Sequence, residues 1–172
     1  SRGLGDVYKR QTITFGELAS TSNRFANFLL NKGLSKGDRI AIMLEPSLPF
    51  YVALFGAMKA GCIAVPLFTL FGPEGLRLRI DDCTPKLLIT NSDLAHLVAN
   101  NDDIETVVTN NTFLTALETE SDLFTPQTAS SYMPKYQYTS GTTPELPEAV
   151  NHRHRAVVTL ILAAHYGTGI RP

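Results

Sequence analysis

The sequence predicts an α/β protein with a mainly parallel sheet covered by helices. Segments with apolar residues at helical spacing alternate with short apolar runs of strand length, and glycine or proline separates them. The 172 residues are 44% hydrophobic and 18% charged, which is the composition of one globular domain with a substantial core. Because strands joined through a helix pair in parallel, this alternation predicts an open sheet with helices on its faces.

The first predicted helix begins at Thr14, because Thr14 and Glu17 have the spacing of a capping box. It stops at Gly33, a residue that tolerates the left-handed conformation after a helix. An apolar run of strand length follows over residues 39–44, and Pro46 closes it.

A second helix is predicted over residues 48–59 and ends at Gly61, and residues 63–67 form the next strand. In the helix over 48–59 the larger apolar residues fall on one face, and they are Tyr51, Leu54, Phe55 and Met58. We interpret Phe50, Tyr51, Phe55 and Met58 as core residues rather than pocket residues.

The alternation continues to the end of the chain. Pro73 suits the first turn of a helix over residues 73–82, and Pro85 breaks that helix. The remaining predicted elements are a strand over 86–90, a helix over 92–98 capped by Ser92, a strand over 104–108, a surface loop over 118–131, a strand over 136–139 and a helix over 154–166.

The two ends of the sequence suggest a piece of a longer protein. Residues 5–11 resemble the translation of a sequencing adapter, so we interpret residues 1–11 as a non-native scar. The native sequence would then begin at Thr12 without an initiator methionine, and residues 12–172 would form one incomplete domain.

The charge balance argues against several classes of partner. The sequence has 15 Lys and Arg residues and 16 Asp and Glu residues, which gives a net charge of -1. This charge predicts no general attraction for nucleic acid. No apolar stretch approaches the roughly 20 residues of a membrane-spanning helix.

The two cysteines, Cys62 and Cys83, do not have the spacing of a disulfide framework, so we expect inert buried thiols and a cytoplasmic location.

The histidines do not predict a metal site. His152 and His154 are two positions apart and cannot share a helical face, and no nearby carboxylate or cysteine completes a ligand set. His96 and His165 stand alone on predicted helices and are interpreted as structural residues.

A candidate phosphate site follows the strand predicted over residues 136–139. Thr139, Ser140, Gly141, Thr142 and Thr143 place four hydroxyl groups around one glycine, and such a loop offers O–H and backbone N–H donors to a phosphate. It lacks the Gly-Lys-Ser/Thr ending of a Walker loop, and Tyr138 stands where a nucleophile elbow requires glycine. A simple Ser/Thr-rich turn remains the alternative.

Three segments together resemble the adenylate-forming superfamily, which includes acyl- and aryl-CoA synthetases, peptide-synthetase adenylation domains and luciferases. Residues 37–41 (GDRIA) are similar to the family's GDRVA strand, and residues 56–67 are similar to its GxxKAGxxxVPL segment. Residues 138–143, with Pro147, Val150 and His154, resemble its phosphate loop and the helix that follows. The order of the segments matches the first part of the family's N-terminal domain.

The resemblance implies a function that the residues alone do not give. In this family ATP and a carboxylate yield an acyl-adenylate and pyrophosphate, and the acyl group passes to a thiol, often that of coenzyme A. By that likeness ATP, Mg²⁺ and coenzyme A are the expected cofactors, and a small carboxylate is the expected substrate. Thr139, Ser140, Gly141, Thr142 and Thr143 match the positions that hold the pyrophosphate. The family's acyl-pocket residues and assisting lysine would lie beyond Pro172, so we expect this chain alone to be inactive.

The phosphate loop also departs from the family pattern. The family continues TSGTT with Gly, a variable residue and Pro-Lys-Gly, whereas this sequence continues with Pro144 and is one residue longer. Glu148 aligns with the basic residue, and a carboxylate facing a triphosphate would oppose its binding. The alternatives are therefore a non-catalytic nucleotide- or phosphate-binding module, or an interaction domain that retains only the fold.

Overall fold

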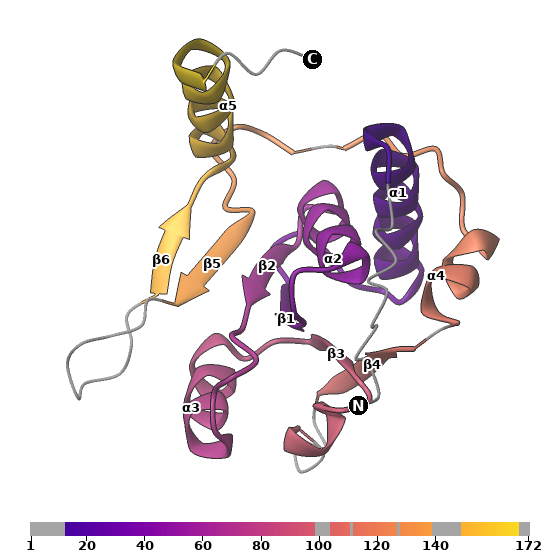
Figure 1. The fold of residues 1–172 in the computed structure, drawn as a ribbon, viewed down its shortest axis with the longest axis vertical. Coiled ribbons are helices and arrows are strands. Elements are labelled where there is room, and N and C mark those ends of the chain that lie inside the picture. Colours follow the sequence, from indigo (N-terminus) through magenta and orange to yellow (C-terminus); the bar gives the residue numbers. More distant parts are fainter. Residues whose placement is uncertain (1–12, 99–103, 111, 127, 139–148, 169–172) are drawn as a thin grey trace, which may run out of the picture.

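The computed structural model describes residues 13–98, 104–110, 112–126, 128–138 and 149–168, and these contain a six-stranded sheet (Figure 1). The strand order is β4-β3-β1-β2-β5-β6. The strands are β1 (Arg39–Met43), β2 (Ile63–Pro66), β3 (Leu87–Asn91), β4 (Glu105–Thr109), β5 (Lys135–Tyr138) and β6 (Ala149–His152). Strands β1 to β5 pair in parallel and β6 pairs antiparallel with β5, which confirms the predicted mainly parallel sheet.

The main helices lie close to their predicted ranges. They are α1 (Phe15–Asn31), α2 (Leu48–Lys59), α3 (Pro73–Cys83) and α5 (His154–Thr168), with the short α4 (Phe113–Ala116), η1 (Ala95–Leu97) and η2 (Leu117–Thr119) between them. The predicted capping box is confirmed, because the backbone N–H of Glu17 donates to Thr14 Oγ1 at 3.1 Å and that of Thr14 donates to Glu17 Oε2 at 2.7 Å. These bonds satisfy N–H groups that the first helical turn leaves without partners.

Alternate residues of the central strands face two separate layers of helix. Ile40, Ile42, Leu87 and Ile89 pack in one cluster with residues of α1 and α2, whereas Ala41, Met43, Val65 and Leu88 pack in another with residues of α3. Figure 1 shows α1 and α2 on the opposite side of the strands from α3. Both faces of the central strands are therefore covered, as near-continuous apolar runs in parallel strands require.

Helix α2 buries a different face from the predicted one. Its buried residues are Val52, Ala53, Gly56 and Ala57, whereas Tyr51 is 42% exposed and Phe55 38% exposed. The assignment of Tyr51 and Phe55 to the core was therefore wrong. The reason is close contact with α1, because a Cβ on Gly56 would lie 2.6 Å from Cδ1 of Phe25. The small residues of α2 admit α1, and the large side chains turn outward.

Three local predictions differ from the structure. Residues 92–98 contain only the 3₁₀ turn η1, because Asn91 Oδ1 accepts the backbone N–H of Leu94 at 2.9 Å in place of a cap by Ser92. Helix α4 is a single turn, too short to give a periodic signal. Strand β6 lies between the predicted strand over 136–139 and the predicted helix over 154–166, where we predicted no strand, and it pairs with β5.

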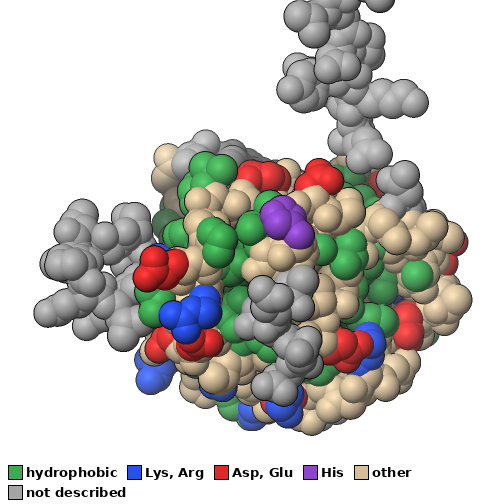
Figure 2. Space-filling model, turned by 90° about the horizontal axis from the view of Figure 1, so that it is seen from below, with side chains coloured by type: hydrophobic (Ala, Val, Ile, Leu, Met, Phe, Trp, Pro, Cys, Tyr) green, Lys and Arg blue, Asp and Glu red, His purple; other side chains and the backbone are tan. Residues whose placement is uncertain are grey.

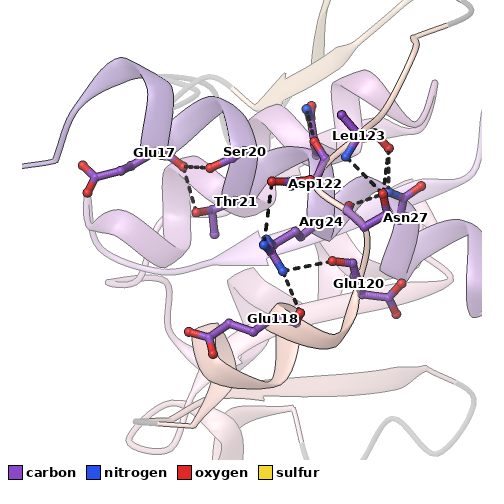
Figure 3. Close-up of polar contacts among 11 residues, drawn as sticks. Glu17, Ser20, Thr21, Arg24, Asn27, Glu118, Glu120, Asp122 and Leu123 are labelled. Atoms are coloured by element: carbon purple, nitrogen blue, oxygen red, sulfur yellow. Dashed lines mark hydrogen bonds and ion pairs between the residues drawn. The ribbon is translucent and has the colours of Figure 1, made fainter.

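Residues 118–123, the first part of the predicted surface loop, are held against the polar face of α1 (Figure 3). Asn23 Nδ2 donates to the carbonyl of Asp122 at 2.8 Å, and Asn27 Nδ2 donates to that of Ser121 at 2.7 Å. Arg24 contributes further bonds to this segment. The polar face of α1 therefore binds backbone carbonyl groups that would otherwise need water.

Helix α5 exposes an unusual number of apolar side chains. Leu160 is 68% exposed, Ile161 61% and Leu162 52%, and Tyr166 is also exposed. In Figure 1 this helix stands beside β5 and β6, away from α1 and α2. Among the described helices, none combines the length and apolar character needed to cross a membrane.

Candidate functional site

A cavity of about 450 Å³ lies at the carboxyl ends of β1, β2 and β5. Residues 44–46, Phe50, residues 66–69, Phe71, Gln137 and Tyr138 line it. Ligands of open α/β sheets bind outside the carboxyl ends of the strands, where loops and not backbone pairing occupy the edge. We call this the strand-end cavity and take it as the candidate functional site.

One wall of the strand-end cavity is aromatic and is fixed from behind by α3. The Tyr138 hydroxyl lies 2.5 Å from Asp82 Oδ2 and also donates toward the Arg79 carbonyl at 3.1 Å. Burial, with the Asp82 hydrogen bond next in effect, raises the pKa of Tyr138 far above its usual value. The phenol therefore stays protonated and is held by α3, so its ring forms part of the wall.

The polar groups of the cavity are few. Glu45 is the single charged residue among its described lining residues, and its Oε1 accepts a hydrogen bond from Thr69 Oγ1. Phe50 lines the cavity and also packs against the main core cluster, so its interpretation as a core residue rather than a pocket residue holds only in part. An apolar or aromatic group fits this lining better than a bare phosphate does, because few donors face the cavity.

The predicted phosphate-loop residues Thr139, Ser140, Gly141, Thr142 and Thr143 lie outside the described residues, as do Pro144, Pro147 and Glu148. The structure places the two strands that flank this segment. Tyr138, the last residue of β5, pairs with Ala149, the first residue of β6. Since Tyr138 also lines the strand-end cavity, the segment begins at the carboxyl edge of the sheet.

The two cysteines are buried, as predicted, and lie apart from the strand-end cavity lining. Burial raises the pKa of the Cys62 thiol and of the Cys83 thiol to about 11. Because the thiolate is the reactive form, both side chains are inert at neutral pH.

The histidines show no metal centre within the described part of the chain, where no three His, Cys, Asp or Glu side chains gather into a ligand set. Burial lowers the pKa of His154, which begins α5.

On the face shown in Figure 2, acidic and basic side chains are interspersed with apolar ones, and neither charge forms a continuous patch.

These features define an open, mainly parallel α/β protein with a ligand-sized cavity at its carboxyl edge. The family model described as AMP-binding enzyme matches residues 5–171. The chain therefore belongs to the AMP-binding enzyme family, as the three sequence segments suggested.

Two relatives show how much of the family's proteins this chain covers. It is 31% identical over 161 residues to surfactin synthase subunit 2 of Bacillus subtilis (strain 168), across 92% of this chain and 4% of that protein. It is 27% identical over 188 residues to 3-hydroxybenzoate–CoA ligase of Aromatoleum sp. (strain CIB), across 100% of this chain and 36% of that protein. The chain thus spans well under half the length of either relative.

Solved structures agree in fold. The chain matches the Brucella canis acyl-CoA synthetase with a TM-score of 0.80 at 26% identity, covering 94% of this chain and 31% of that one. It matches VinN, solved in complex with 3-methylaspartate, with a TM-score of 0.85 at 24% identity, covering 95% of this chain and 46% of that one.

Proposed function

We propose that this chain supplies the phosphate-binding part of a ligase that activates a carboxylate with ATP. In the proposed reaction a carboxylate oxygen attacks the α-phosphorus of ATP, the bond to pyrophosphate breaks, and an acyl-adenylate forms. The acyl group then passes to the thiol of coenzyme A, which releases AMP. The observation that carries the proposal is the family match over residues 5–171, together with the loop over residues 139–143.

The roles of this chain's residues follow from their chemistry. The hydroxyls of Thr139, Ser140, Thr142 and Thr143 would donate to the β- and γ-phosphates. Mg²⁺ would supply countercharge to the same oxygens when bound. The strand-end cavity, next to Tyr138 and mainly apolar, would receive a non-phosphate part of a substrate.

The substrate class rests on the relatives. An aromatic or aliphatic carboxylate is favoured by the likeness to the 3-hydroxybenzoate–CoA ligase and to the Brucella acyl-CoA synthetase. The peptide-synthetase relative favours an amino-acid substrate and a different thiol. We place the ligase substrates first because the match to the 3-hydroxybenzoate–CoA ligase includes the whole of this chain and 36% of that protein's length.

A non-catalytic nucleotide-binding module is the second candidate, and the observation that favours it is the sequence at Glu148. That residue puts a negative charge where the family has a basic residue. A carboxylate within about 4 Å of a phosphate charge would oppose binding by roughly 4 kcal/mol at an effective dielectric constant near 20.

Calorimetry and isotope exchange test whether this chain binds nucleotide and whether it is active by itself. We expect the purified chain to bind Mg·ATP and to show no exchange of labelled pyrophosphate into ATP. The paired substitutions Ser140→Ala and Thr142→Ala should weaken binding, whereas Ser131→Ala, before the amino end of β5, should not. Exchange above background would contradict the inactivity of this chain, and absence of nucleotide binding would favour an interaction domain.

A further inference from the structure

A buried arginine without a carboxylate partner stands behind the strand-end cavity. Arg79 of α3 is only 8% exposed, and its Nη1 donates to the carbonyl of Gly75 at 2.7 Å. Its Nε is buried and has no hydrogen-bond partner among the described residues. The ion pairs found in that part of the chain do not include it. Burying a guanidinium with an unsatisfied Nε and no ion pair costs free energy. The position of Arg79 therefore indicates a role other than keeping the surface soluble.

Arg79 lies against the two aromatic residues that form the cavity wall. Its guanidinium carbon is 3.7 Å from the centre of the Phe71 ring and 5.6 Å from that of the Tyr138 ring. Both rings line the strand-end cavity, whereas Arg79 itself does not. The guanidinium therefore acts on the cavity through the rings that it contacts.

The same helix also fixes the orientation of the Tyr138 ring. Its hydroxyl is bonded to Asp82 Oδ2 and to the backbone carbonyl of Arg79. One turn of α3 thus holds Tyr138 at its hydroxyl and at its face. Phe71, which precedes α3, is fixed by the guanidinium at 3.7 Å.

We propose that Arg79 is a positioning residue for the strand-end cavity, which sets the Phe71 and Tyr138 rings against a bound substrate. The proposal rests on the proposed function, because it assigns Arg79 a part in binding at the same carboxyl edge.

The chemistry requires arginine rather than any cation. A planar guanidinium stacks on an aromatic face, whereas a lysine ammonium is a strongly hydrated point charge and resists such burial.

The test uses substitutions at Arg79 and at a matched control. Arg77 lies two residues earlier on α3 with an exposed side chain, 3.5 Å from Asp81. Arg79→Gln and Arg79→Lys are compared with Arg77→Gln and Arg77→Lys. The wild-type sequence contains no tryptophan, so Phe50→Trp introduces a single fluorescent reporter at the cavity in every variant.

Two readouts are needed. Titration with Mg·ATP gives the dissociation constant, and acrylamide quenching of Trp fluorescence without ligand reports the order of the wall. We expect both Arg79 variants to weaken Mg·ATP binding about tenfold, the lower end of the effect found for residues that orient metal ligands. We also expect both to increase quenching, while the Arg77 variants change neither. Urea unfolding identifies any variant that has lost its fold. Tyr138→Phe, which removes the hydroxyl bonded to Asp82 and to the Arg79 carbonyl, then replaces that variant.

The outcomes separate the two proposals. If the reporter chain with Arg79 intact binds no Mg·ATP, the proposed function fails, and the quenching comparison still decides whether Arg79 orders the wall. Unchanged quenching and affinity in a folded Arg79→Gln variant would overturn the positioning role. Full retention of both by Arg79→Lys would also overturn it, since charge alone would then suffice.

Discussion

The Arg24 guanidinium donates from Nη1 to the carbonyl oxygen of Glu118 at 2.7 Å, across 94 positions of sequence. The same nitrogen lies 3.0 Å from the carbonyl oxygen of Glu120, and Nη2 lies 3.8 Å from a carboxylate oxygen of Asp122 (Figure 3). One side chain of α1 thus contacts every second residue of the segment over 118–122, namely Glu118, Glu120 and Asp122. The segment has little regular structure of its own, so its position depends on this helix.

Loss of the Arg24 side chain should release that segment. Arg24→Met removes the charged donor and leaves two carbonyl groups without it, and we expect a loss of about 1–3 kcal/mol in unfolding free energy. Cleavage by a glutamate-specific protease at Glu118 and Glu120 should accelerate. Arg77→Met, at an exposed arginine of α3, is the control and should change neither quantity. Equal cleavage rates in wild type and Arg24→Met would show that other contacts hold the segment.

Gly56 is required where α2 crosses α1. A methyl group there would lie 2.6 Å from Cδ1 of Phe25 and 2.9 Å from the carbonyl oxygen of Ser22, so one helix must move. We expect Gly56→Ala to lower the unfolding free energy by about 1–3 kcal/mol through overpacking. Urea unfolding measures this change. Gly16→Ala is the matched control in α1, since its nearest contact is 3.9 Å away and alanine favours helix. A Gly56→Ala variant as stable as Gly16→Ala would contradict the close crossing.

The buried cysteines predict a loss of stability in alkali. Burial holds the pKa of Cys62 and Cys83 at about 11, whereas the pKa of an exposed cysteine is about 8.5. Between these values the unfolded chain has lost protons that the folded chain keeps, so the unfolding free energy falls as pH rises. The slope is at most about 1.4 kcal/mol per pH unit for each thiol.

Denaturant unfolding at several pH values tests this sign. The double substitution Cys62→Ala and Cys83→Ala should flatten the alkaline slope, even if it lowers stability at pH 7. A thiol reagent should label wild type only as the protein unfolds. An unchanged slope in the double variant would mean that other groups cause the alkaline loss, such as the half-buried Tyr136 and Tyr138, whose pKa values are also raised.

Helix α5 predicts association through apolar contact. Leu160 and Ile161 are more than half exposed, and large exposed apolar surfaces promote aggregation or partner binding. Leu160→Glu with Ile161→Glu should raise solubility and reduce binding of an apolar dye, with little change in unfolding free energy. Val52→Glu, at a fully buried position of α2, should instead unfold the protein. A large loss of stability in the α5 variant would show that these side chains support the fold.

The sequence predicted a phosphate site at residues 139–143, which lie outside the described residues, and it did not predict the strand-end cavity. The sequence pattern predicted a strand over residues 136–139 before the hydroxyl-rich loop, and β5 over Lys135–Tyr138 confirms this strand. It gave no sign that Arg79, 59 positions earlier, would share a hydrogen bond with Tyr138. Contacts at such separation depend on how α3 crosses the sheet, which local spacing does not encode.

The sequence by itself determined the alternation of helices and strands, the capping box at Thr14 and the limits set by Pro73 and Gly33. Those features arise from interactions within a few residues, so local chemistry suffices. Tertiary structure alone decided that α2 buries Gly56 rather than Tyr51, and that β6 exists at all. Both depend on a neighbour distant in sequence, since a face is buried only where another element covers it and a strand forms only where it finds a partner.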